Sequence, residues 1–160
     1  MGAHSAGRLV LALARRVLAG GAIVVPAGPA AGLRLGPRLP LTHVQGHGLV
    51  RGTLEPGVQE ALRRHVGRGA VVFDVGANLG FFALLAGRLT GPSGRVVAFE
   101  PLPESAAVAR EHARLNRLEQ VVVHECAVGD RSGSARSCAS TSGAGRISRT
   151  AGRIPGPSRS

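Results

Sequence analysis

The residues best suited to chemistry in this chain are two carboxylates that flank a glycine-containing loop. Asp74 ends an apolar run, and the loop after it carries Gly76 and Gly80. Glu100 ends a second apolar run about twenty residues further on. Glycines let a backbone approach a ligand closely, and the start of a helix points unpaired N–H groups at it. An acid after the second run can accept hydrogen bonds from a ribose diol. The pattern predicts a nucleotide-binding half-site.

The chemistry of the loop indicates which ligand it binds. Loops that cradle a pyrophosphate use the pattern Gly-x-Gly-x-x-Gly. Here Asp74 precedes the loop, and Asn78 stands where the middle glycine would be. A carboxylate at this point would repel a pyrophosphate, whereas it suits a ligand that carries an ammonium and a sulfonium. We therefore expect S-adenosylmethionine (SAM), which has both cations and no phosphate. A nicotinamide-binding Rossmann domain is the less favoured alternative.

The same segment resembles class I SAM-dependent methyltransferases, and more narrowly the FkbM-type O-methyltransferases. The matching text is Val72-Phe-Asp-Val-Gly-Ala-Asn-Leu-Gly-Phe-Phe, Gly91-Pro-Ser-Gly-Arg-Val-Val-Ala-Phe-Glu-Pro, Asn116 and Ala127-Val-Gly-Asp-Arg-Ser-Gly133. The resemblance covers roughly residues 45–133. It implies a Rossmann-like α/β doubly wound fold and transfer of the SAM methyl group to a hydroxyl of a small molecule or glycan.

Eight residues are the expected cofactor contacts. Asp74 is expected to hold the amino group of SAM, directly or through water, and Glu100 to accept hydrogen bonds from both ribose hydroxyls. The full set is Asp74, Gly76, Asn78, Gly80, Glu100, Pro101, Ala127 and Val128. The last two are expected to contact the adenine. No residue can be named catalytic from the sequence.

Glu55 and Asn116 have competing interpretations. The segment Gly52-Thr-Leu-Glu55-Pro56 matches a Gly-x-x-Glu-Pro segment of the family, which implies a place for Glu55 near the cofactor. A carboxylate that only interacts with a helix dipole explains Glu55 equally well. Asn116 is expected to be a helix C-cap rather than a ligand.

Periodicity predicts the elements that position these residues. Strands are expected over residues 70–74, 95–100 and 120–126. Helices are expected over residues 55–66 and 104–115, with inward faces formed by Val58, Leu62 and Val66 in the first and by Ala107, Val108, His112 and Leu115 in the second. Residues 32–53, punctuated by glycine and proline, indicate a hairpin or lid before the domain.

Three regions follow from the composition. Residues 1–44 form a poorly defined extension, residues 45–133 a partial SAM-binding domain, and residues 134–160 a disordered low-complexity tail without Leu, Val, Phe, Asp or Glu. The tail stands where the family continues with further strands. The sequence therefore predicts a truncated, inactive methyltransferase, translated out of frame after about Gly133. A non-catalytic SAM-binding fragment, or one that does not fold, is the alternative.

The charge distribution argues against specific nucleic-acid binding. The net charge is +11, but all the acidic residues lie between Glu55 and Asp130, where the arginines nearly balance them. The excess arginines lie before residue 51 and after residue 133, and the chain has no Lys, Tyr or Trp. Two cysteines and scattered histidines form no metal-binding pattern. We expect a cytoplasmic protein without a membrane span, and a small-molecule acceptor in full-length relatives.

Overall fold

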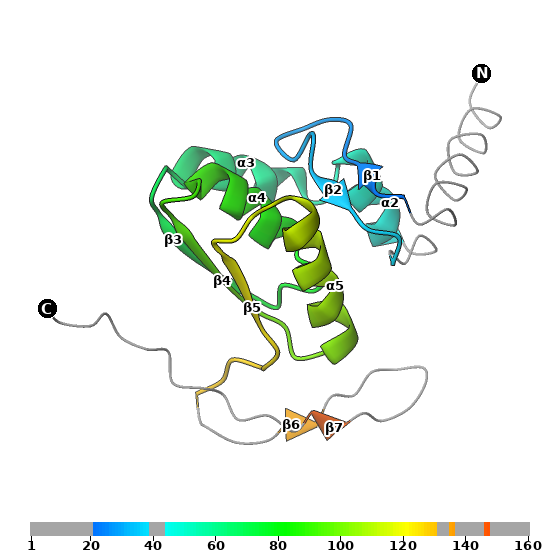
Figure 1. Ribbon diagram of the computed structural model, residues 1–160, viewed down its shortest axis with the longest axis vertical. Coiled ribbons are helices and arrows are strands. Elements are labelled where there is room, and N and C mark those ends of the chain that lie inside the picture. The colour runs from blue at the N-terminus through cyan, green and yellow to red at the C-terminus, as the bar shows by residue number, and fades with distance from the viewer. Residues whose placement is uncertain (1–20, 39–43, 131–134, 137–145, 148–160) are drawn as a thin grey trace, which may run out of the picture.

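The computed structural model describes residues 21–38, 44–130, 135–136 and 146–147 (Figure 1). In chain order the elements are β1 (Ile23–Val24), β2 (Arg34–Leu35), α2 (Val44–Arg51), α3 (Pro56–His65), β3 (Val71–Val75), α4 (Phe81–Thr90), β4 (Arg95–Phe99), α5 (Pro103–Leu115), β5 (Val121–His124), β6 (Ala135–Arg136) and β7 (Arg146–Ile147). The three predicted strands and both predicted helices are present, each with ends shifted by one or two residues.

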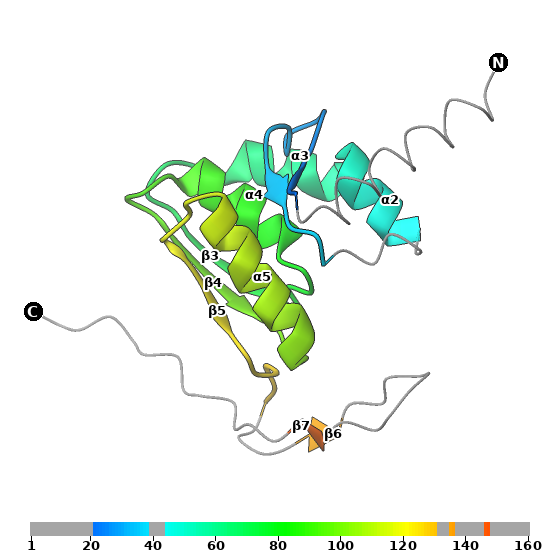
Figure 2. The same cartoon turned by 45° about the vertical axis from the view of Figure 1, so that its right-hand side comes forward.

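Strands β3, β4 and β5 form a parallel sheet in chain order. Parallel neighbours need a crossover connection, and here α4 and α5 supply the two crossovers. Both helices lie on the same side of the strands (Figures 1 and 2). The α/β fold with a parallel sheet is therefore confirmed, as part of a doubly wound architecture.

The register divides the strand residues between two unlike faces. Val72 pairs with Val96 and Val96 with Val121, so these three side chains share the face covered by α4 and α5. The opposite face carries apolar side chains that remain exposed: Val71 at 61%, Phe73 at 50%, Val75 at 62% and Val122 at 38%. No helix in the part of the chain that the structure describes covers this second face (Figures 1 and 2).

Prolines and glycines set the limits of the helices. Pro56 and Pro103 stand in the first turn of α3 and α5, where the missing N–H costs no hydrogen bond. Helix α4 starts after Gly80, whose left-handed φ of 82° favours glycine. A Cβ on Gly80 would lie 2.9 Å from the Cβ of Ala109, so the start of α4 packs directly on α5.

The β1–β2 hairpin packs on the same core as the sheet. Its apolar residues Ile23, Val25, Leu33 and Leu35 are each 2% exposed or less. Asn116 holds the hairpin to α5: its Oδ1 accepts from the Arg34 N–H at 2.8 Å, and its Nδ2 donates to the Arg34 carbonyl at 2.7 Å. The sequence placed this segment in a poorly defined extension because paired strands of two residues give no periodic signal.

Two helix faces differ in detail from the predicted ones. In α3 the buried residue is Gln59, whereas Val58 is 41% exposed. In α5 the buried residues are Ala106, Val108, Ala109, His112 and Ala113, so the inward face is turned slightly from the predicted stripe. Small alanines face the sheet because α5 and α4 pack closely. Asn116 is the C-cap of α5, as predicted.

Little of the predicted tail is described. Strands β6 and β7 pair with each other in antiparallel fashion, Ala135 opposite Ile147. The remaining residues of 134–160, and the whole of residues 1–20, lie outside the described residues. Among the helices that are described, none is long and apolar enough to cross a membrane.

Candidate cofactor site

The loop between β3 and α4 has a backbone shape that its residue types permit. Gly76, Asn78 and Gly80 all have left-handed φ angles, of 83°, 50° and 82°. Glycine takes this conformation without strain, and asparagine tolerates it better than most residues do. The N–H groups of Gly76 and Ala77 both donate to the carbonyl of Phe99 at 2.9 Å. The loop is therefore attached to the end of β4.

Glu100 fastens the same loop from the other side. It is 6% exposed. Its Oε2 accepts the N–H of Asn78 at 2.8 Å, and its Oε1 accepts the N–H of Leu102 at 2.9 Å. Each carboxylate oxygen keeps a second lone pair. Glu100 thus orders the loop, while its expected contact with the ribose stays a prediction.

Asp74 is a carboxylate with one oxygen left without a partner. Its Oδ2 is buried and makes no hydrogen bond among the described residues. Burial raises the pKa of Asp74, the backbone N–H of Ala83 opposes this shift, and the nearby charge of Glu100 adds to it. A buried acceptor without a donor is costly. A cationic donor would relieve that cost.

The loop leaves room for a ligand at Gly76. A Cβ built on Gly76 would meet nothing within 4 Å, although the neighbouring backbone is fixed by hydrogen bonds. Space beside an ordered backbone is what close approach of a cofactor requires. Asp74 and Gly76 therefore present an unpaired acceptor and an open approach at one end of β3.

The remaining expected contacts lie at the same edge of the sheet. Pro101 and Ala127 follow β4 and β5 and are half-buried, and Val128 is 48% exposed. Parallel strands end at one edge of a sheet, so these residues share that edge with Asp74. The rings of Phe99 and His124 stack there, with centroids 5.5 Å apart. All eight predicted residues are thus in the described part of the chain, on the loops at this edge.

His112 supports the loop from below and was missed as a functional residue. It is fully buried on α5, and its Nδ1 lies 2.9 Å from the carbonyl of Leu79. A carbonyl only accepts, so Nδ1 carries the proton and Nε2 is left unprotonated and without a partner among the described residues. Burial lowers the pKa of His112. A histidine within an apolar helix face was the available signal.

Gln59 holds the segment that precedes the loop. Its Nε2 donates to the carbonyls of Gly52 at 3.0 Å and of Leu54 at 2.7 Å. It is fully buried. Gly52 has a φ of 73°, and a Cβ there would lie 2.2 Å from the carbonyl oxygen of Ala27. This turn places Glu55 across from the glycine loop. A polar residue within a helix carried no sign of this role in the sequence.

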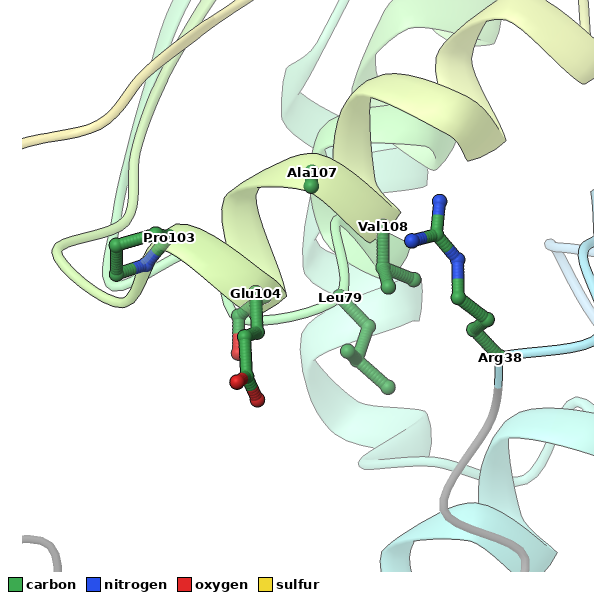
Figure 3. A pocket seen from close by; sticks show the side chains of 7 residues that line it. Arg38, Leu79, Pro103, Glu104, Ala107 and Val108 are labelled. Atoms are coloured by element: carbon green, nitrogen blue, oxygen red, sulfur yellow. The ribbon is translucent and has the colours of Figure 1, made fainter. Parts of the chain in front are cut away.

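Two hollows border the loop. The smaller has a volume of about 250 Å³ and is lined by Leu49, Leu54, Glu55, Gly76, Ala77, Asn78, Leu79, Phe81 and Phe82. The larger, of about 540 Å³, runs along the first turns of α5. In this groove Leu79 lies between Glu104 and Arg38 (Figure 3). Arg38 forms an ion pair with Glu111. Within the described residues, no three His, Cys, Asp or Glu side chains could hold a metal ion.

A family model described as "Methyltransferase FkbM domain" matches residues 74–158, more than half of the chain. The chain belongs to this family. The matched range begins at Asp74, on the carboxylate that opens the site, and extends past Gly133 to include β6 and β7. It therefore runs on into the region that was expected to be a disordered tail.

Two curated FkbM-family matches and relatives cover only part of their own length. Over 68 residues the chain is 47% identical to "31-O-demethyl-FK506 methyltransferase FkbM" of Streptomyces tacrolimicus, covering 42% of this chain and 25% of that protein. Over 64 residues it is 44% identical to "Protein-L-isoaspartate O-methyltransferase" of Aeropyrum pernix, covering 40% and 24%. The chain spans about a quarter of the length of each.

Solved structures of methyltransferases also match. A SAM-dependent methyltransferase from Aquifex aeolicus is 26% identical with a TM-score of 0.40, covering 42% of this chain and 37% of that one. A SAM-dependent O-methyltransferase from Thermotoga maritima is 23% identical with a TM-score of 0.42, covering 44% and 28%.

The predicted family and fold class are thus confirmed, and so is SAM as the cofactor of the FkbM methyltransferase family. The eight cofactor contacts and the domain boundaries stay predictions. So does translation out of frame after Gly133.

Proposed function

We propose that this chain binds SAM at the edge of the sheet formed by Asp74, the glycine loop and Glu100. The observation that carries the proposal is the buried Oδ2 of Asp74, which lacks a hydrogen-bond donor beside an open approach at Gly76. SAM offers an ammonium as that donor. The expected contacts fit the remaining groups: Gly76, Asn78 and Gly80 along the cofactor, Glu100 and Pro101 at the ribose, and Ala127 and Val128 at the adenine.

The reaction we propose is O-methylation of a hydroxyl on a small molecule or glycan. Bound SAM supplies a methyl group already activated by its sulfonium, so the protein mainly has to align the acceptor and receive its proton. The FkbM relative from Streptomyces tacrolimicus is named for a 31-O-demethyl acceptor, which supports a hydroxyl as the target. We place the protein in the cytoplasm, where SAM is available, and expect no specific nucleic-acid partner.

We further propose that the 160-residue chain does not turn over by itself. The described sheet has three strands, and the outer edge of β3 has no partner among the described residues. Substrate groups in doubly wound folds sit beyond the carboxyl ends of several strands on both sides of the first. The alternative, a fragment that binds SAM without catalysing transfer, differs only in what a full-length form would do.

Calorimetry with SAM and with NAD tests the cofactor. SAM should bind more tightly than NAD. Glu100→Ala should weaken SAM binding by about 1–3 kcal/mol, because charge-assisted bonds to the ribose and to the loop are both lost. Tighter binding of NAD would contradict the proposal. Transfer of a labelled methyl group to any hydroxyl acceptor, above the level of the Glu100→Ala control, would show that the chain alone is active.

A further inference from the structure

The smaller hollow beside the glycine loop contains a single formal charge. Apart from Glu55, its side chains are apolar, apart from the exposed amide of Asn78. Its volume of about 250 Å³ is below the range of about 300–1,000 Å³ that holds a whole drug-sized ligand. The hollow therefore suits one short, partly aliphatic arm of a larger molecule, with a positive charge to meet Glu55.

Glu55 is held in an unusual way for a residue that serves only a helix start. Its φ of 41° and ψ of 67° are left-handed, a conformation that is unfavourable for a residue with a Cβ. Its side chain makes no capping hydrogen bond to α3. Backbone strain of this kind is often found at functional sites. The interpretation of Glu55 as a helix-start carboxylate thus lacks the bond that it would need.

The turn that carries Glu55 is fixed rather than loose. Gln59 binds the carbonyls on both sides of the turn, at Gly52 and Leu54, and Gly52 packs against the β1–β2 hairpin. The carbonyl of Glu55 in turn accepts the N–H groups of Val58 at 2.9 Å and of Gln59 at 3.2 Å. The carboxylate therefore extends from an ordered backbone toward the hollow.

The opposite wall of the hollow is the beginning of α4. Phe81 and Phe82 occupy its first turn, where backbone N–H groups have no partner within the helix. The third amide of that turn, on Ala83, already binds Asp74. Helix N-termini attract carboxylates. One wall thus offers a negative side chain and the other offers N–H donors, an arrangement complementary to an α-amino acid group.

We propose that Glu55 recognises the ammonium of the amino-acid arm of SAM, and that the first turn of α4 faces the carboxylate of the same arm. The ammonium has three donors, so Glu55 and Asp74 can both accept from it. This inference rests on the proposed function, because it assigns one arm of the proposed cofactor to a specific hollow. It makes the N-terminal segment part of the cofactor site.

Calorimetry with three ligands isolates that arm. S-adenosylhomocysteine keeps the amino-acid arm, whereas 5′-methylthioadenosine lacks it. Glu55→Gln should weaken binding of SAM and S-adenosylhomocysteine by about tenfold or more, and should leave 5′-methylthioadenosine unchanged. Glu60→Gln is the matched control: Glu60 lies on α3, its carboxylate pairs with Arg63 and Arg64, and it does not line the hollow. It should bind all three ligands as the wild type does.

A second variant guards against misfolding. Glu55→Gly suits the left-handed backbone, so it should fold at least as well as the wild type and still show the selective loss. Equal weakening of all three ligands, or no weakening by either variant, would overturn the inference while the SAM proposal stands. Wild-type protein that binds 5′-methylthioadenosine as tightly as SAM would also overturn it. Absence of binding to any of the three would overturn the proposed function, and the inference with it.

Discussion

Asp74 combines a structural cost with an expected benefit in binding. Its pKa is raised chiefly by burial, against the Ala83 hydrogen bond and together with the charge of Glu100. The stabilising contribution of such a carboxyl is present below its unfolded-state pKa, and is lost as pH rises through the folded-state pKa. At neutral pH the protein without ligand therefore carries an unfavourable charge at this position, which a bound ammonium would offset.

Asp74→Asn tests this balance. At pH 7 the variant without ligand should be more stable than the wild type by about 1 kcal/mol, because no buried charge remains. Its affinity for SAM should fall by about tenfold, because a charged hydrogen bond becomes neutral. Urea titrations at several pH values measure the first effect, whose size should shrink as the wild-type carboxyl protonates at lower pH. Lower stability with unchanged affinity would contradict this account.

At the scale of elements, two buried polar side chains join helices to the segments that carry the site. His112 links α5 to the glycine loop, and Gln59 links α3 to the turn of Glu55. Each also has one buried atom without a partner among the described residues, Nε2 in His112 and Oε1 in Gln59. Polar groups in such positions specify how elements meet more than they add to stability.

His112 should make the stability of the protein depend on pH. Because burial lowers its pKa, its contribution is present above the unfolded-state value of about 6.5 and is lost as pH falls through the folded-state pKa. Stability should therefore decrease between pH 7 and pH 5. In His112→Asn, where the side-chain amide can donate to Leu79 but does not titrate, the decrease should be smaller.

The control for this prediction is His124→Asn, because His124 is an exposed histidine at the same edge of the sheet. Its decrease with pH should match that of the wild type in urea titrations. If both variants lose the pH dependence equally, the effect does not come from the contact between His112 and Leu79.

Gln59→Leu should destabilise the protein by about 1–3 kcal/mol, because the carbonyls of Gly52 and Leu54 lose their donor. Arg64→Gln, on the solvent side of the same helix, should change stability by less than about 0.5 kcal/mol. Thermal unfolding of both variants measures the difference. A Gln59→Leu variant as stable as Arg64→Gln would mean that the turn does not depend on this clamp.

Sequence patterns could predict the elements of the sheet and the residues of the loop, because both rest on local signals. Runs of β-branched residues mark β3, β4 and β5, and the glycines mark the turn. The roles of His112, Gln59 and the β1–β2 hairpin could not be predicted, because they depend on partners 33, 7 and 82 positions away for which no local pattern exists. The place of Glu55 was suggested by family resemblance alone.

For the whole molecule, the unlike faces of the sheet determine its behaviour in solution. Val71, Phe73, Val75 and Val122 are exposed together on the face away from α4 and α5. Exposed apolar patches and open strand edges promote association. The purified chain should therefore self-associate as its concentration rises.

Replacing Val71 and Phe73 together by Thr should reduce this association, because Thr keeps the β-propensity of the strand while making the face more polar. Val58→Thr, at an exposed apolar residue on α3, should not reduce it. Sedimentation velocity at a series of concentrations distinguishes the three proteins. A wild type that stays monomeric throughout would show that other parts of the chain shield this face.

The clamp between Asn116 and the hairpin also has a consequence for the order of folding during synthesis. Each pair of neighbouring sheet strands is close in the chain, as with Val71 and Arg95, so each can pair soon after it leaves the ribosome. Arg34, in contrast, must wait for a partner 82 residues later. We expect the first-made segment to dock last, and pulsed hydrogen exchange during refolding would detect its late protection. The wall that carries Glu55 would then close over a glycine loop already in place.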